Sequence, residues 1–326
     1  MPASTDAATI PSTVEHFRDG KYFNPGAPDH NFRAAWKWMR NRKPGVWREW
    51  IPSQSGPKPP MEVEGSNLRV TWVNHSTVLL QMNRVNILTD PVWSERVSPV
   101  RFTGPKRHRA PGLRFEDLPP IHLLLISHNH YDHFDTSTLK RLAKRGLDET
   151  VVFCPLGLEK PLRRIGFRRV HVLDWWQTQS WRDLRVHCVP AQHFSARWPW
   201  DRNRTLWCGW LVETGAGNVY FAADTGFCSV FEEIRGRFPT IRLALLPIGA
   251  YDPEWFMGPI HMTPEQAVEA RSILGARVAI GIHFGTFALA DDGETDPSDR
   301  LRQALDGRAD AGQFWIVQEG EGRLVP

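Results

Sequence analysis

The sequence predicts a single layered α/β domain. Its 326 residues are 41% hydrophobic and 23% charged, the composition of an ordinary globular protein. From residue 68 onward, short strand-like runs alternate with segments that carry helix start signals, and no linker follows residue 60. Strands interspersed with helices in one uninterrupted stretch are typical of helices packed on sheets. We therefore expect an N-terminal extension at residues 1–60, packed on a catalytic body at residues 61–326.

The extension begins with a polar segment, residues 1–30, that shows no hydrophobic period and predicts a tail. A helical pattern follows at Asn31–Arg40, and the Pro-, Gly- and Ser-rich stretch Pro52–Pro60 predicts a loop. The first residues lack the basic start and apolar core of a signal peptide. No apolar run reaches the roughly 20 residues needed to span a bilayer. We therefore expect a cytoplasmic protein, with peripheral contact to a membrane as a compatible variant.

The body contains strand-like runs, some alternating between apolar and polar residues and others continuously apolar. This mixture predicts sheets that are covered on one face or on both. The runs are Leu68–Gln81, Val85–Thr89, Ile121–Ile126, Val151–Phe153, Val170–Leu173, Leu184–Val189, Thr205–Val212, Asn218–Ala222, Leu243–Ile248, Val278–Ile282 and Phe314–Val317.

Three helices of the body carry start signals. Asp135 can cap a helix that runs to Arg145 and stops at Gly146. The stretch Thr263–Gln266 combines a Thr cap, Pro at the first helical position and Gln three residues after the cap, which is a capping box. Asp296, followed by Pro, predicts a further helix start.

One short stretch of the pattern His-x-His-x-Asp-His concentrates potential metal ligands directly after an apolar run that ends at Ile126. His128 and His130 are two residues apart and can point the same way in an extended segment. Asp132 and His133 then turn toward a neighbouring position. Imidazole and carboxylate are ligands of divalent transition metals. Four such groups within six residues predict a metal site that can supply ligands to two ions.

Three further candidate ligands lie far downstream, each after a strand-like run: His193, Asp224 and His283. The ends of strands are the places where a rigid scaffold presents side chains to a shared cleft. Together with the first motif, these residues complete a set of seven.

This set resembles the metallo-β-lactamase-fold hydrolases. The resemblance implies an αββα sandwich with a dinuclear metal centre at one edge. It also implies that His128, His130 and His193 hold the first metal, that Asp132, His133 and His283 hold the second, and that Asp224 bridges the two.

A finer resemblance concerns the flanking blocks, which extend over roughly residues 65–290. They are similar to those of the N-acylphosphatidylethanolamine-hydrolysing phospholipase D family and its bacterial relatives. The blocks are Thr71–Thr77, Leu88–Pro91, Gly104–Arg107, Pro190–His193, Gly249–Tyr251, Trp255–Met257 and His283–Leu289.

The resemblance implies a phosphodiesterase that uses a metal-bridging hydroxide. Two metals that share Asp224 would lower the pKa of a bridging water from about 15.7 toward about 7. Zinc suits this His and Asp set best, and manganese or iron also fits because no thiolate takes part. We expect the hydroxide to attack phosphorus directly, without a covalent enzyme intermediate.

Four other residues are candidates for roles beside the metals. His261 sits just before the Thr263 cap, and the resemblance implies that it contacts the substrate phosphate or the leaving group, so it is a catalytic candidate together with Asp132. Tyr251 is a candidate for substrate binding in the same cleft. His75 and Asp90 are predicted to orient the metal ligands, as metal-bound histidines usually require.

Several functions compete. The first is hydrolysis of a phospholipid such as an N-acylphosphatidylethanolamine, or of another phosphodiester; 15 tryptophans could line a greasy cleft. The second is a lactonase or other small-molecule hydrolase that acts on a sugar-phosphate lactone or related ester. A nuclease is disfavoured, because the net charge of +4 is not gathered in a basic stripe. A non-catalytic metal-binding protein is disfavoured because all seven ligands are present.

Overall fold

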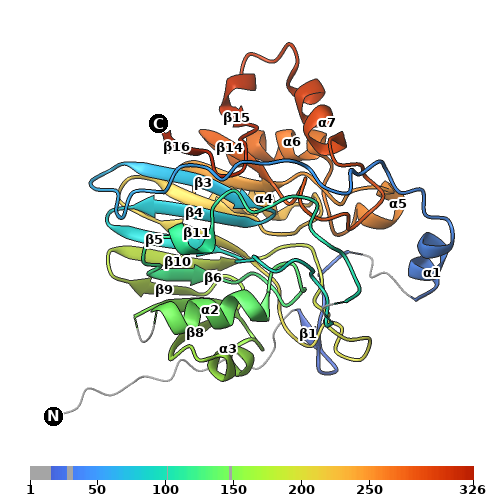
Figure 1. Ribbon diagram of the computed structural model, residues 1–326, viewed down its shortest axis with the longest axis horizontal. Coiled ribbons are helices and arrows are strands. Elements are labelled where there is room, and N and C mark those ends of the chain that lie inside the picture. The colour runs from blue at the N-terminus through green and yellow to red at the C-terminus, as the bar shows by residue number, and fades with distance from the viewer. Residues whose placement is uncertain (1–15, 28–31, 101, 147–148) are drawn as a thin grey trace.

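The computed structural model describes residues 16–27, 32–100, 102–146 and 149–326. Two seven-stranded sheets lie face to face, with helices on both outer faces (Figure 1). The αββα sandwich that the resemblance implied is therefore confirmed. The predicted tail falls largely on residues 1–15 and 28–30, which lie outside the described part of the chain, whereas residues 17–22 form a two-stranded hairpin of β1 (Phe17–Arg18) and β2 (Lys21–Tyr22).

The first sheet has the order β16-β3-β4-β5-β6-β7-β8. Its last four strands run parallel, while β16, β3, β4 and β5 pair antiparallel with their neighbours. The strands are β3 (Leu68–Asn74), β4 (Thr77–Met82), β5 (Val85–Thr89), β6 (Leu123–Leu125), β7 (Val151–Pro155), β8 (Arg169–Leu173) and β16 (Gly322–Val325).

The second sheet has the order β15-β14-β13-β12-β11-β10-β9. The strands from β12 to β15 are parallel, and β9 to β12 pair antiparallel. They are β9 (Thr178–Trp181), β10 (Leu184–Val189), β11 (Gly209–Glu213), β12 (Asn218–Phe221), β13 (Ile241–Pro247), β14 (Val278–Ile282) and β15 (Phe314–Trp315).

The helices cover the outer faces of the two sheets. In Figure 1, α2 and α3 lie on one side of the sandwich and α4, α6 and α7 on the other, while α1 lies beside α5 at one end. Their bounds are α1 (Phe32–Arg40), α2 (Thr136–Gly146), α3 (Glu159–Ile165), α4 (Val230–Arg237), α5 (Glu254–Met257), α6 (Pro264–Leu274) and α7 (Asp296–Leu305), with short 3-10 turns at Phe115–Asp117 and Ala311–Gln313.

Side chains alternate between two buried layers along the central strands. In β6, Leu123 and Leu125 face the core between the sheets, whereas Leu124 packs in the layer beneath α2 and α3. All three are fully buried. Because both faces of these strands are covered, the sequence of β6 is continuously apolar rather than alternating.

The structure corrects three predicted boundaries. The predicted run Leu68–Gln81 is two strands joined by a turn, in which His75 adopts a left-handed backbone with φ of 45°. The run predicted at Thr205–Val212 becomes a strand only at Gly209, since the preceding residues belong to an irregular loop. Asp296 is the first residue of its helix, with Thr295 at the cap position, and its carboxylate accepts from the Gly293 N–H at 2.7 Å.

Residues 41–60 run along the outside of the body. The backbone N–H groups of Gly45, Ile51 and Gly56 donate to carbonyls of residues 291, 108 and 112 at 2.6–2.7 Å. The side chain of Ile51 is buried. The division into an extension and a catalytic domain at residue 60 stays a prediction.

Among the described residues, no helix combines the length and the apolar character needed to cross a bilayer.

The start of α6 allows a direct test of local stability. The Thr263 hydroxyl accepts from the Gln266 N–H at 3.3 Å, and the Gln266 side chain accepts from the Thr263 N–H at 2.9 Å, as the predicted capping box requires. We expect Thr263→Ala to lower the free energy of unfolding by about 1 kcal/mol. Thr263→Ser keeps the hydroxyl and should stay near the wild type in urea unfolding. Equal loss in both variants would contradict a role for the hydroxyl.

Candidate metal centre

The strands that precede the candidate ligands all end at one edge of the sandwich. In the first sheet, β3 and β5 both run antiparallel to β4, and β6 runs parallel to β5. In the second sheet, β10 and β12 both run antiparallel to β11, and β14 follows the direction of β12. Strands of one sheet that run in the same direction end at the same edge, so the residues that follow them lie close together there. The residues delivered there are His75, Asp90, His128, His130, Asp132, His133, His193, Asp224 and His283.

Three histidines form the first group of candidate ligands. Nδ1 of His130 lies 2.8 Å from Nε2 of His128 and 3.2 Å from Nε2 of His193. These three nitrogens all lie within 4.8 Å of one another. His128 and His193 are buried, while His130 is partly exposed. The arrangement matches the trio assigned to the first metal.

Asp132 is the centre of the second group. Its Oδ2 atom lies 3.3 Å from Nε2 of His133 and 3.4 Å from Nε2 of His283. Nε2 of His75 approaches the same oxygen at 2.9 Å. His75 was predicted only to orient ligands, and the structure places it close enough to belong to the ligand group itself.

Asp224 lies between the two groups. Its Oδ2 atom is 3.1 Å from Nε2 of both His133 and His283. The same oxygen is 3.7 Å from Nε2 of His193 and 3.9 Å from Nε2 of His128. One carboxylate oxygen thus reaches histidines of both groups, which is the position expected of a bridging ligand.

Hydrogen bonds on the far side of the rings fix which nitrogen faces the centre. Nδ1 of His193 lies 3.0 Å from the Ile260 carbonyl, and only a protonated Nδ1 can donate to it. Nδ1 of His133 lies 2.7 Å from the carboxylate of Asp90, which also accepts from the Ser127 hydroxyl. In His193 this leaves the lone pair of Nε2 toward the cluster, and in His133 the contact with Asp90 fixes the ring so that Nε2 faces the cluster.

Burial sets the charge of the first group. It lowers the pKa of His128 and His193 well below their ordinary value and the pKa of His130 to about 4. These rings are therefore neutral at pH 7, and neutral imidazole is the form that binds a metal.

The second group has the opposite electrostatics. Burial alone would lower the pKa of His283, but Asp224 and Asp132 raise it to about 9, and they raise the pKa of His133 well above its ordinary value. Within the described residues, Nε2 of His133 and of His283 is buried and has no hydrogen bond of normal geometry, although each atom lies 3.1 Å from the Asp224 carboxylate. The buried carboxylates of Asp132 and Asp224 are stable only if positive charge lies beside them. Divalent metal ions bound by these oxygens and by the imidazole nitrogens would supply that charge, so the donor set fits such ions.

A cavity of about 320 Å³ opens onto this cluster. Its floor contains His130, His193, Asp132, Asp224 and His283. Its other walls are mainly apolar, from Ala35, Trp38, Phe194, Phe256, Met257, Ile260 and Leu289. The candidate metal site therefore lies at the end of a mainly apolar pocket.

Of the two residues predicted to contact substrate, His261 lines the cavity and Tyr251 does not. His261 lines the cavity, with its ring centroid 5.1 Å from that of His193 and 5.2 Å from that of His283. Tyr251 is buried and is not part of the cavity wall, and its ring packs against the guanidinium of Arg300 at 4.6 Å. A contact between Tyr251 and substrate stays a prediction.

Two features of the pocket were not predicted from the sequence. Trp38 comes from α1, and its ring stacks on Phe256 at 5.1 Å. Arg202 is the only lysine or arginine among the described residues that line the cavity. Its guanidinium lies 4.1 Å above the ring of Phe194, which in turn meets His130 edge-on at 4.4 Å. Neither residue stands in a recognisable motif.

Comparison with known proteins agrees with this geometry. Residues 85–284 match the Beta-lactamase superfamily domain. N-acyl-phosphatidylethanolamine-hydrolyzing phospholipase D 1 of Caenorhabditis elegans is 39% identical over 269 residues, which cover 78% of this chain and 75% of that protein. The mitochondrial N-acyl-phosphatidylethanolamine-hydrolyzing phospholipase D of Saccharomyces cerevisiae is 34% identical over 250 residues, which cover 74% of this chain and 53% of that protein.

A solved structure shows the same fold. Igni18, a metallo hydrolase from Ignicoccus hospitalis, superimposes with a TM-score of 0.59 at 20% identity, covering 80% of this chain and 99% of that one. The chain thus belongs to the β-lactamase superfamily, as a metal-dependent hydrolase of the metallo-β-lactamase fold related to the N-acylphosphatidylethanolamine-hydrolysing phospholipases D.

Proposed function

We propose that this protein is a dinuclear-metal phosphodiesterase of the phospholipase D type that acts on N-acylphosphatidylethanolamine-like glycerophospholipids. The observation that carries the proposal is the pocket, in which apolar walls and one arginine lead to a cluster of histidines and carboxylates. Relatives named for this activity support it. In the reaction, water supplies a hydroxyl to phosphorus, the bond from phosphorus to the head-group oxygen breaks, and the departing alcohol takes the proton.

The two groups of ligands would each hold one divalent ion. In the proposal, His128, His130 and His193 hold the first ion, Asp132, His133 and His283 hold the second, and Asp224 contacts both. When bound, the ions supply Lewis acidity that activates water and neutralises phosphoryl oxygens. Zinc remains the metal that the ligand set favours.

The remaining residues position the substrate. Trp38, Phe256 and Met257 offer apolar surface to acyl chains. Arg202, held on Phe194, offers a fixed positive charge beside the cluster, which suits the anionic phosphodiester better than a neutral lactone.

His261 lines the cavity and is the candidate to contact the departing oxygen. Burial lowers its pKa to about 3, so the imidazole is neutral at pH 7. A neutral ring can donate one hydrogen bond to the head-group oxygen, and Nδ1 of His261 has no hydrogen-bond partner among the described residues. We propose that His261 orients the leaving group through this bond.

Removal of one candidate ligand tests the proposed function. We expect His130→Ala to lose at least one equivalent of bound metal and to lower kcat/KM on N-acylphosphatidylethanolamine by more than about 100-fold, because even residues behind the ligands contribute 10- to 100-fold. Metal analysis and product assay by mass spectrometry measure both quantities.

The control for this variant is His171→Ala, which removes a partly buried histidine of β8 outside the cluster. It should keep metal and activity. The proposal fails if the wild type cleaves lactones but no phosphodiester, or if His130→Ala keeps both its metals and its activity.

The carboxylate of Asp90 provides a second test. It holds Nδ1 of His133 at 2.7 Å and also accepts from the Ser127 N–H at 2.8 Å. Asp90→Asn keeps the size of the side chain and removes the charge that orients His133. We expect metal affinity to fall by about 10- to 100-fold in chelator competition. Unchanged affinity in a folded variant would show that Asp90 does not support the site.

Arg202 provides a test of substrate charge. We expect Arg202→Gln to lower kcat/KM on bis-p-nitrophenyl phosphate about tenfold, the scale of a lost charged hydrogen bond, and to change hydrolysis of a neutral p-nitrophenyl ester less than about twofold. Arg204→Gln, an exposed neighbour outside the pocket, is the matched control. Equal losses on both substrates would show that Arg202 does not select charge.

A further inference from the structure

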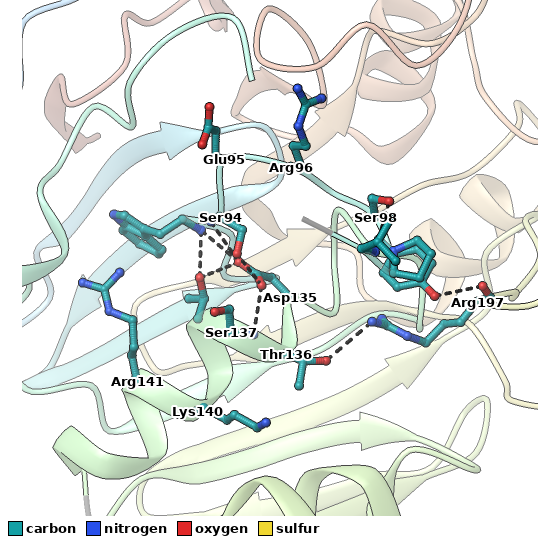
Figure 2. Close-up of a pocket in the computed structure, with 15 residues that line it drawn as sticks. Ser94, Glu95, Arg96, Ser98, Asp135, Thr136, Ser137, Lys140, Arg141 and Arg197 are labelled. Carbon is teal, nitrogen blue, oxygen red and sulfur yellow. Dashed lines mark hydrogen bonds between the residues drawn. The ribbon is translucent and has the colours of Figure 1, made fainter. Parts of the chain in front are cut away.

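A second cavity, of about 620 Å³, lies on the other side of the metal-binding loop. Its walls are residues 93–96 and 98–100, the first turns of α2, and the side chains of Tyr131 and Arg197 (Figure 2). It shares no lining residue with the cavity that opens onto the metal cluster. It is therefore a separate site, although Tyr131 stands between the candidate ligands His130 and Asp132 in the sequence.

Three cations of this cavity lack a carboxylate partner among the described residues: Arg96, Lys140 and Arg197. Within the described ranges, the one hydrogen bond of the Arg96 side chain goes to the Gly104 carbonyl, at 2.6 Å. Lys140 is exposed on α2 and forms no ion pair within the described part of the chain. Figure 2 shows Arg96 across the cavity from Lys140, with Arg197 entering from a third side.

Arg197 is held in place by the protein. One of its guanidinium nitrogens donates to the carbonyls of Asn129 and Phe134, each at 2.8 Å, and the group lies 3.9 Å over the ring of Tyr131. Its other terminal nitrogen has only a long contact, 3.5 Å, with the Thr136 hydroxyl. Burial holds the pKa of this guanidinium below its ordinary value, so its neighbours do not fully compensate its charge.

The carboxylates of the cavity are already engaged. Asp135 accepts hydrogen bonds from the N–H groups of Trp93, Ser94 and Ser137 and from the hydroxyls of Ser94 and Thr138, at 2.6–3.3 Å (Figure 2). Glu95 is exposed and pairs with Lys106 at 3.2 Å. A fourth cation, Arg141, pairs with Glu116 at 2.9 Å. The hydrogen bonds to Asp135 come from neutral groups and leave its negative charge, which acts on Arg197, so the three cations together keep an excess of positive charge over this one carboxylate.

We propose that this cavity binds a phosphomonoester. A phosphate dianion matches a cavity lined by more cations than carboxylates, and charge-assisted bonds to phosphate are among the stronger hydrogen bonds in proteins. Hydroxyls of Ser98, Thr136 and Ser137 can add further bonds. The volume suits a small ligand, and Trp93, Pro99 and Val100 offer apolar surface to the part that carries the phosphate.

Two sources provide this chemistry: a water-soluble phosphomonoester such as glycerol phosphate, and the head group of a phosphatidate lipid. The reaction under Proposed function would release a phosphatidate, but the cavity and its charges do not depend on that reaction. The two sources are separated by presenting the same group in solution and on a vesicle.

The test is isothermal titration calorimetry of the full chain with glycerol 3-phosphate, followed by sedimentation with phosphatidylcholine vesicles with and without phosphatidate. We expect saturable binding that weakens with salt. Lys140→Gln should weaken it about tenfold or more, as expected for one lost charged hydrogen bond. Lys144→Gln, an exposed lysine one turn further along α2 and outside the cavity, should bind like the wild type.

The vesicle arm identifies the source. Sedimentation with phosphatidate that depends on Lys140 assigns the lipid head group, and Lys140-dependent binding of glycerol 3-phosphate alone assigns the soluble ligand. The proposal is overturned if no saturable binding occurs, or if Lys140→Gln binds like the wild type. It is also overturned if Arg202→Gln abolishes binding while Lys140→Gln does not, because the ligand would then occupy the metal pocket.

Discussion

The carboxylate of Asp224 is the group on which the site depends. A buried carboxylate is costly unless positive charge compensates it, and this one lies 3.1 Å from imidazole nitrogens on two different elements. With Asp132 nearby, the centre concentrates two negative charges in a buried space. The surrounding histidines, and the hydrogen bonds behind them, form a cage that stabilises those charges.

The cage requires both sheets. The candidate ligands before residue 134 follow strands of the first sheet, and those after residue 190 follow strands of the second. The sheets meet through a shared apolar core, so their edges cannot shift independently without disturbing packing. Rigid strands therefore hold side chains far apart in sequence at contact distances, while irregular segments beyond the strand ends, such as residues 194–205, supply the pocket walls.

Much of the cluster could be predicted, because its signal is local. The residues from His128 to His133 are nearly consecutive, and His193, Asp224 and His283 each follow a strand-like run. The capping box at Thr263 is equally local, since both hydrogen bonds join residues three apart. Assignment of these residues to two metals rested on resemblance, and their roles as ligands stay predictions.

The parts that could not be predicted depend on contacts between distant segments. The turn at His75 divides a run that the sequence predicts as one strand, and the His75 ring meets Asp132, 57 residues later. Arg202 reaches Phe194 because the loop folds back on itself, with the Asn203 N–H donating to the Ser195 carbonyl at 2.7 Å. Trp38 reaches the pocket from the N-terminal helix. No local pattern contains these pairings.

The most direct measurement of the central claim is anomalous diffraction from crystals of the zinc-loaded protein, collected on both sides of the zinc absorption edge. The account predicts two anomalous peaks. One should be surrounded by His128, His130 and His193, and the other by Asp132, His133 and His283, with Asp224 in contact with both. A single peak, or peaks away from Asp224, in fully active protein would contradict the account.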